Sequence, residues 1–84
     1  MKIRITEEDI EQGTPCSSGQ CPVAKAIRRD IGSTASHVTV GGTAIWIGNV
    51  HYRTPPQVFE FIYGFDNGDS VAPFEFELSL LNRQ

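Results

Sequence analysis

The chain has 84 residues and a formal net charge of −3, with seven Lys and Arg against ten Asp and Glu. A chain of this length forms one domain at most, and it buries only about 60 % of its unfolded surface. The excess of acids argues against a protein that binds long nucleic acids by neutralising their phosphates. No apolar run approaches the roughly 18 residues of a membrane span, and the N-terminal region turns acidic where a signal peptide turns apolar. We therefore expect a cytoplasmic protein with no membrane partner.

The N-terminal part of the sequence predicts one strand and two helices. Polar and apolar residues alternate over residues 2–5, which is typical of a strand. Thr6, followed three residues later by Asp9, predicts a capping box that begins a short helical turn. Pro22 is favoured at the first position of a longer helix, because its missing N–H needs no partner there. Apolar residues at helical spacing continue this helix until Gly32 predicts its end.

The remaining sequence predicts a three-strand meander, a helix and a final strand. β-branched and aromatic residues predict the strands of the meander over residues 36–40, 43–47 and 50–53. Gly41-Gly42 and Gly48-Asn49 separate these strands, and each pair is typical of a two-residue hairpin turn. Thr54 predicts the cap of a second long helix, with two prolines in its first turn. Strict alternation predicts a last strand over residues 72–80.

This order of elements (β-α-β-β-β-α-β) predicts an α+β fold for a single domain over residues 1–84. We expect two layers, with about five mostly antiparallel strands in one sheet and two helices on one face. The residues expected under the helices are apolar: Ile3, Ile5, Val38, Val40, Ile45, Ile47, Val50, Phe74, Phe76 and Leu78. If the terminal strands pair, Glu75 and Glu77 face Lys2 and Arg4 as opposite charges.

The turn positions set the strand register, and the register decides which residues share the face away from the helices. Two-residue turns place Trp46 between His37 on one neighbouring strand and His51 on the other. Thr39 and Arg53 belong to the same face. A Trp between two His, with an Arg nearby, is unusual on a face that no helix is expected to cover.

This face has three interpretations on the sequence alone. As a binding surface, it would stack a base on Trp46, bind phosphate or carboxylate at Arg53, and orient the ligand with the two His. The ligand would then be a small nucleotide-like molecule, with a host protein as the alternative partner. The same residues would suit a homo-oligomer interface, because Trp and Arg are enriched in interface cores. In the third interpretation, Trp46 simply packs against its cross-strand neighbours.

The loop before the longer helix is a weaker candidate, as an anion site. Ser17, Ser18 and Gly19 are small and polar, and Cys21 lies where the helix N–H groups are free to bind an anion. The same helix terminus would lower the pKa of the Cys21 thiol. The loop has neither the Walker pattern nor the Arg of a phosphatase loop, so an ordinary cap with solvated serines explains it better.

We expect no catalytic residue, no metal and no cofactor. Two Cys and two His suggest zinc, but His37 and His51 are placed on strands about 9–10 Å apart with Trp46 between them. A cysteine nucleophile would need an adjacent base, and both His are placed on the face away from the helices. Cys16 and Cys21 are expected as two thiols rather than a disulfide.

Three short motifs give a resemblance to a known group of proteins: Cys-Pro-Val-Ala-Lys-Ala at residues 21–26, Thr-Pro-Pro at 54–56 and Pro-Phe-Glu-Phe at 73–76. Together they resemble small uncharacterised proteins encoded by tailed phages and prophages. The group has no assigned catalytic residues. The resemblance implies the cytoplasm of a bacterial host and an accessory role. Such a protein would counter host defence, by sequestering a nucleotide-derived signal or by occluding a host protein.

Overall fold

The computed structural model describes residues 2–31 and 37–80. In chain order the elements are β1 (Lys2–Ile5), α1 (Glu7–Gln12), α2 (Pro22–Ile31), β2 (Val38–Val40), β3 (Ala44–Ile47), β4 (Val50–Arg53), α3 (Pro56–Asp66), β5 (Phe74–Glu77) and β6 (Ser79–Leu80). The α+β class is confirmed, and so is the antiparallel pairing of the strands. The helix end predicted at Gly32 and the strand start predicted at Ser36 lie outside the described residues.

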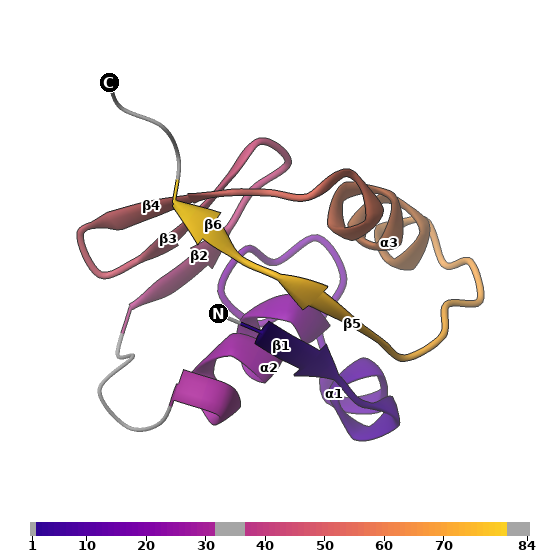
Figure 1. Cartoon of the computed structure of the whole chain (residues 1–84). Coiled ribbons are helices and arrows are strands. Elements are labelled where there is room, and N and C mark those ends of the chain that lie inside the picture. The colour runs from indigo at the N-terminus through magenta and orange to yellow at the C-terminus, as the bar shows by residue number, and fades with distance from the viewer. Residues whose placement is uncertain (1, 32–36, 81–84) are drawn as a thin grey trace.

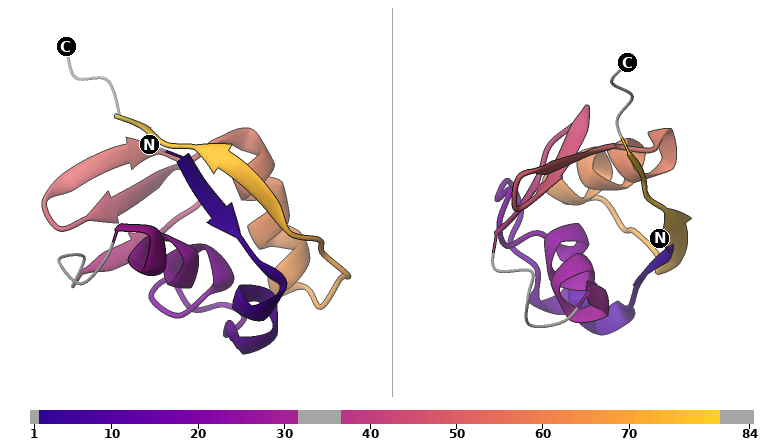
Figure 2. Two further views of the ribbon diagram at one scale, coloured as in Figure 1. Left: turned by 60° about the horizontal axis from the view of Figure 1, so that its bottom comes forward. Right: turned by 60° about the vertical axis from the view of Figure 1, so that its left-hand side comes forward.

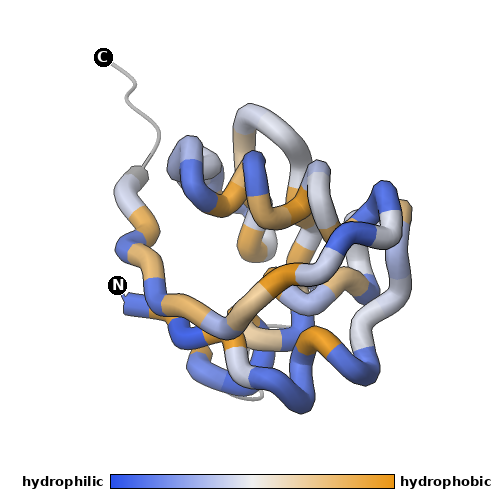
Figure 3. The backbone as a smooth tube through the Cα atoms, turned by 90° about the vertical axis from the view of Figure 1, so that its right-hand side faces the viewer, coloured by the Kyte–Doolittle hydropathy of each residue, from blue (hydrophilic) through white to orange (hydrophobic). Residues whose placement is uncertain are grey.

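The strands form two sheets, so the single five-stranded sheet was a wrong prediction. β1 pairs with β5, whereas β2, β3, β4 and β6 form a second sheet in that order. The last strand is interrupted at Leu78, and its two parts join different sheets (Figure 1). Its alternation of hydrophilic and hydrophobic residues nevertheless continues through the break, as the colouring of Figure 3 shows. The final segment therefore connects the two sheets.

The terminal strands pair as predicted. Lys2 lies opposite Glu77 and Arg4 opposite Glu75. The Nε of Arg4 lies 3.2 Å from a carboxylate oxygen of Glu75. Both side chains of this ion pair are largely exposed, so it contributes little to stability and mainly favours this register.

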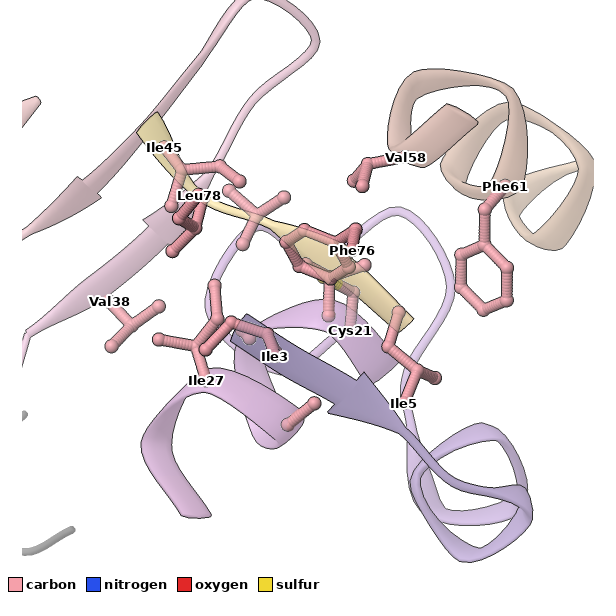
Figure 4. Close-up of a cluster of buried hydrophobic side chains, with 14 residues drawn as sticks. Ile3, Ile5, Cys21, Ile27, Val38, Ile45, Val58, Phe61, Phe76 and Leu78 are labelled. Atoms are coloured by element: carbon pink, nitrogen blue, oxygen red, sulfur yellow. The ribbon is translucent and has the colours of Figure 1, made fainter. Parts of the chain in front are cut away.

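Helix α2 forms the centre of the core. Most of its first two turns is buried, at Pro22, Val23, Ala24, Ala26 and Ile27. The helix packs against β1 of one sheet and β2 of the other. Figure 4 shows Ile27 close to Ile3 and Val38, which belong to these two strands. The core therefore lies where the helix meets both sheets.

The expected core differs from the observed one near the β3–β4 turn. Val50 was predicted to be covered, but it is 43 % exposed. It pairs with Ile47 at the end of the hairpin, next to the turn, and Ile47 is itself only half-buried. The sequence pattern placed both on the correct face but could not show how far along the strands the helices extend.

The β3–β4 hairpin has the predicted register, and the β2–β3 hairpin does not. Gly48-Asn49 joins β3 to β4, with Ile47 opposite Val50. In the first hairpin Val40 pairs with Ile45, because the chain reverses at Gly42 and Thr43 instead of at Gly41-Gly42. The predicted pairing is therefore displaced by two residues, which leaves each side chain on its predicted face.

Thr54 accounts for this displaced turn. Its hydroxyl donates to the Gly41 carbonyl at 2.9 Å, and its N–H donates to the Thr43 carbonyl at 3.2 Å. The predicted role of Thr54 as a helix cap was wrong, because Pro55 occupies the N-cap position of α3 without a side-chain hydrogen bond. The buried hydroxyl thus fixes a loop that lies eleven or more residues earlier in the chain.

We expect Gly48→Ala to lower the free energy of unfolding by about 1 kcal/mol, because a Cβ disfavours the left-handed backbone. Gly48 has a φ of +62°, and open space surrounds the position of an added Cβ, so the effect is conformational rather than steric. Gly48→Asn is the control, since Asn tolerates this conformation and should lose roughly half as much. Urea denaturation measures both, and equal losses would contradict the explanation.

Candidate functional site

The face of the larger sheet directed away from the core is the first candidate, and we call it the Trp46 face. It consists of the outward residues of β2, β3 and β4: Thr39, Ala44, Trp46, His51 and Arg53. Trp46 lies on the middle of these three strands, opposite Thr39 on one side and His51 on the other. Its side chain is 42 % exposed, whereas Ile45 on the other face is fully buried. The predicted separation of the two faces is confirmed.

The predicted row of His37, Trp46 and His51 was wrong at its first member. Thr39, not His37, lies opposite Trp46. His37 precedes β2, and its carbonyl accepts a hydrogen bond of 2.8 Å from the N–H of Gly48. The displaced β2–β3 turn explains the difference. His37 is exposed two residues before Thr39, so by strand alternation it lies toward the same face but diagonal to Trp46.

Trp46 and His51 contact each other through their rings. The two ring planes meet at 84°, an edge-to-face arrangement. The Nε2 of His51 is buried and has no hydrogen-bond partner among the described residues. The imidazole therefore covers part of the indole, and the remainder of Trp46 stays exposed.

Arg53 adds a free cation to the Trp46 face. It lies opposite Ala44, one position from the Trp46–His51 pair on the same face. Its side chain is exposed, and no acid of residues 2–31 or 37–80 forms an ion pair with it. The planar guanidinium therefore keeps its donors available for a carboxylate or phosphate of a partner.

At least four surface hollows lie elsewhere on the described part of the chain. Their volumes are about 410, 270, 470 and 400 Å³, and none of them includes a residue of the Trp46 face. Small-molecule sites are usually concave and enclose most of their ligand. The Trp46 face is formed by side chains of three neighbouring strands. Such a sheet surface suits a broad contact with another protein.

The loop before α2 is fixed by its own hydrogen bonds. The Ser17 carbonyl accepts the N–H of Cys21 at 3.1 Å, and the Ser17 hydroxyl accepts the N–H of Gln20 at 3.2 Å. The Ser18 carbonyl accepts the N–H of Val40 at 2.9 Å, which fastens the loop to the edge of β2. The two serines therefore shape the loop and attach it to the sheet.

The surroundings of Cys21 oppose an anion. The backbone N–H groups of Val23 and Ala24 at the start of α2 lie near the Cys21 sulfur and favour its thiolate form. Burial nevertheless raises the pKa of the Cys21 thiol, which corrects the expected lowering. Asp66 lines the same 270 Å³ hollow, and its carboxylate accepts the N–H of Cys16 at 2.8 Å. The anion site predicted at residues 17–21, Gly19 included, therefore has a carboxylate beside it, which would repel an anion.

The described residues contain neither a metal-binding cluster nor a helix that could cross a membrane. No group of three or more His, Cys, Asp or Glu in residues 2–31 and 37–80 is arranged to hold a metal ion. In the same residues, no helix combines the length and the hydrophobicity that a membrane crossing requires. Cys16 is an exposed free thiol and Cys21 a buried one.

Sequence reasoning missed a polar cluster around Arg29 of α2. The Arg29 Nη1 lies 2.7 and 2.6 Å from the two carboxylate oxygens of Asp9, and its Nε lies 3.2 Å from Asp30 Oδ1. Asp9 also accepts the N–H of Thr6 at 2.9 Å within the predicted capping box. Burial alone would raise the pKa of Asp9, but the hydrogen bonds from Arg29 and Thr6 lower it overall. The capping box was the one local signal of this cluster.

Comparison with protein-family models, with curated proteins and with solved structures gave no match to this chain. Its function is therefore inferred from its own residues.

Proposed function

We propose that this chain is a non-enzymatic binding protein, and that the Trp46 face contacts a partner protein. The observation that supports this proposal is the half-exposed Trp46 beside His51 on the outward face of the sheet. A large aromatic side chain of this kind contributes much apolar contact area when a partner covers it. Trp and Arg are also the residues most often found at energetic centres of protein interfaces.

The shape of the face favours a protein over a small molecule. A protein interface covers about 800 Å² on each partner and needs no deep cavity. A small ligand usually needs a hollow, whereas the Trp46 face is made of side chains on three neighbouring strands of one sheet. In the phage setting that the sequence motifs suggest, the partner would be a host protein involved in defence.

A second candidate is a small nucleotide-like ligand, which the free guanidinium of Arg53 favours. Arg53 and Trp46 share one face, so a base stacked on the indole would have a cation nearby for its phosphate. A second copy of the chain would have to complete the pocket, because one face alone does not enclose a ligand.

We expect Trp46→Ala to weaken partner binding by at least about 30-fold, which is the loss of a typical interface hot spot. Immobilised parent chain would capture the partner from a bacterial lysate, and the dissociation constant of the purified complex would then be compared between variants. Tyr63→Ala is the matched control, because Tyr63 is an aromatic residue that is 66 % exposed on α3. Equal affinity of Trp46→Ala and the parent would contradict the proposal.

The chain contains one Trp, so its fluorescence reports directly on this face. Nucleotide binding predicts that nucleoside phosphates or cyclic dinucleotides change the Trp46 emission and raise the melting temperature, and that Arg53→Ala abolishes both effects. A homo-oligomer interface predicts instead that Trp46→Ala lowers the mass seen by analytical ultracentrifugation. The first result would identify a nucleotide on the Trp46 face, and the second would identify another copy of the chain; either would contradict a host protein as the only partner.

A further inference from the structure

The outer edge of β1 has hydrogen-bonding groups that its own sheet does not use. β1 pairs with β5 alone among the described strands, and α2 lies along its other side (Figure 2). Every second residue of an antiparallel strand directs both its N–H and its C=O to the same side. In β1 the outward residues are Lys2 and Arg4, and the same spacing continues to Thr6. Such an edge can pair with a strand of another chain.

Side chains occupy these outward groups in the way a neighbouring strand would. The Asp30 carboxylate accepts the N–H of Arg4 at 2.9 Å, where a strand would supply a carbonyl. The Arg29 Nη2 donates to the carbonyl of Arg4, where a strand would supply an N–H. Farther along, the N–H of Thr6 donates to the Asp9 carboxylate. Three successive backbone groups on this edge are thus satisfied by side chains.

The two side chains that contact Arg4 are ordered by each other and by Asp9. Arg29 binds Asp30 through its Nε and Asp9 through its Nη1, which leaves its Nη2 directed at the strand. Arg29 and Asp30 are adjacent in the last turn of α2, so one helix end positions both groups. The end of α2 therefore presents to Arg4 both a donor, from Arg29, and an acceptor, from Asp30, as a neighbouring strand would.

The packing around this pair allows it to move aside. A hollow of about 410 Å³ adjoins it, lined by Lys2, Arg4, Thr6, Arg29, Asp30 and Glu75. The side chains of Arg29 and Asp30 are 43 % and 27 % exposed, so their removal leaves no buried cavity. Their effect on the edge can be separated from the stability of the core.

We propose that Arg29 and Asp30 substitute for a neighbouring strand, and so keep the outer edge of β1 closed to strand addition by a second copy of this chain. A second copy fits this edge because an antiparallel pair centred on Arg4 is self-complementary. Each Arg4 would donate its N–H to the other and accept one in return, which gives a two-fold contact. Each Arg4 already has Glu75 as an ion-pair partner, which reduces the repulsion between the two cations.

The test compares Asp30→Ala with Asp30→Asn. Both variants remove one negative charge, but only alanine removes the oxygen that accepts the Arg4 N–H. In dilute solution we expect the Arg4 amide of Asp30→Ala to exchange with solvent at least about tenfold faster than in the parent. In Asp30→Ala the partly exposed Arg29 has lost its Asp30 contact, so the N–H of a second copy can replace its Nη2 at the Arg4 carbonyl. At millimolar concentration we therefore expect this variant to approach twice the parent's mass, while its Arg4 amide becomes protected again. Asp30→Asn should resemble the parent in both measurements.

Two results would overturn the proposal. One is an Asp30→Ala variant that keeps both the mass and the slow Arg4 exchange of the parent. The other is equal association of the alanine and asparagine variants, which would assign the effect to charge instead of to the lost acceptor. Circular dichroism of each variant checks that it is folded, and folding is expected because alanine favours a helix end that is partly exposed.

Discussion

Ile27→Ala is expected to lower the free energy of unfolding by about 3 kcal/mol, through lost apolar burial and a residual cavity. The Ile27 side chain is fully buried on α2, where the helix meets one strand of each sheet. Figure 4 shows it beside Ile3 and Val38. For 84 residues the total stability is expected to be about 4–13 kcal/mol, so this loss is a large share of it.

Urea denaturation followed by circular dichroism measures the effect of Ile27→Ala. Ile31→Ala is the matched control, because Ile31 lies at the end of the same helix and is only half-buried. We expect the control to lose less than half as much stability. Equal losses for the two variants would show that the core is not centred on the first turns of α2.

The elements predicted correctly are those determined by residues close together in sequence. Thr6 and Asp9 form both bonds of the capping box that their spacing indicates. Pro22 begins a helix because its ring suits the first position, whatever the helix packs against. The Gly48-Asn49 turn gave the Trp46–His51 pair correctly, since a two-residue turn fixes the register of its own hairpin.

The features that sequence reasoning missed depend on contacts between distant segments. The β2–β3 turn is held by the Thr54 hydroxyl, which comes from a distant part of the sequence. The turn predicted from Gly41-Gly42 alone was therefore displaced, and it placed His37 instead of Thr39 opposite Trp46. The break at Leu78 follows from the last segment pairing with β1 and then with β4. No local pattern distinguishes such a segment from one continuous strand. For the same reason the hydrogen bond from Arg29 to the outer edge of β1 could not be predicted.

The Cys21 thiol shows how one environment can reverse a local rule. A helix N-terminus favours the thiolate, and the backbone N–H groups of Val23 and Ala24 do act in that direction on the Cys21 pKa. Desolvation is nevertheless the larger effect, because the residue is only 3 % exposed. Sequence spacing indicated the helix end correctly but gave no measure of burial, and burial decided the direction of the pKa change.

Asp9→Asn is expected to lower the free energy of unfolding by about 2 kcal/mol at neutral pH, because it weakens charge-assisted bonds to a buried group. Asp9 is 7 % exposed, and its pKa in the folded protein lies below the ordinary value of about 3.9. The unfolded chain therefore takes up this proton at a higher pH than the folded chain. The stability that Asp9 contributes is complete above about pH 4 and is lost as the pH falls through its folded-state pKa.

Parent and Asp9→Asn should consequently differ most near pH 7 and converge in strong acid, in urea denaturation repeated across this range. Glu7→Gln is the control, an exposed acid in the same helical turn that should change stability by less than about 0.5 kcal/mol. Arg29→Met tests the cause. It removes the strongest of the hydrogen bonds that lower the pKa of Asp9, so that pKa should rise and the loss of stability in acid should shrink. An Arg29→Met protein that loses as much stability in acid as the parent would show that Thr6 alone holds the Asp9 carboxylate in its charged form.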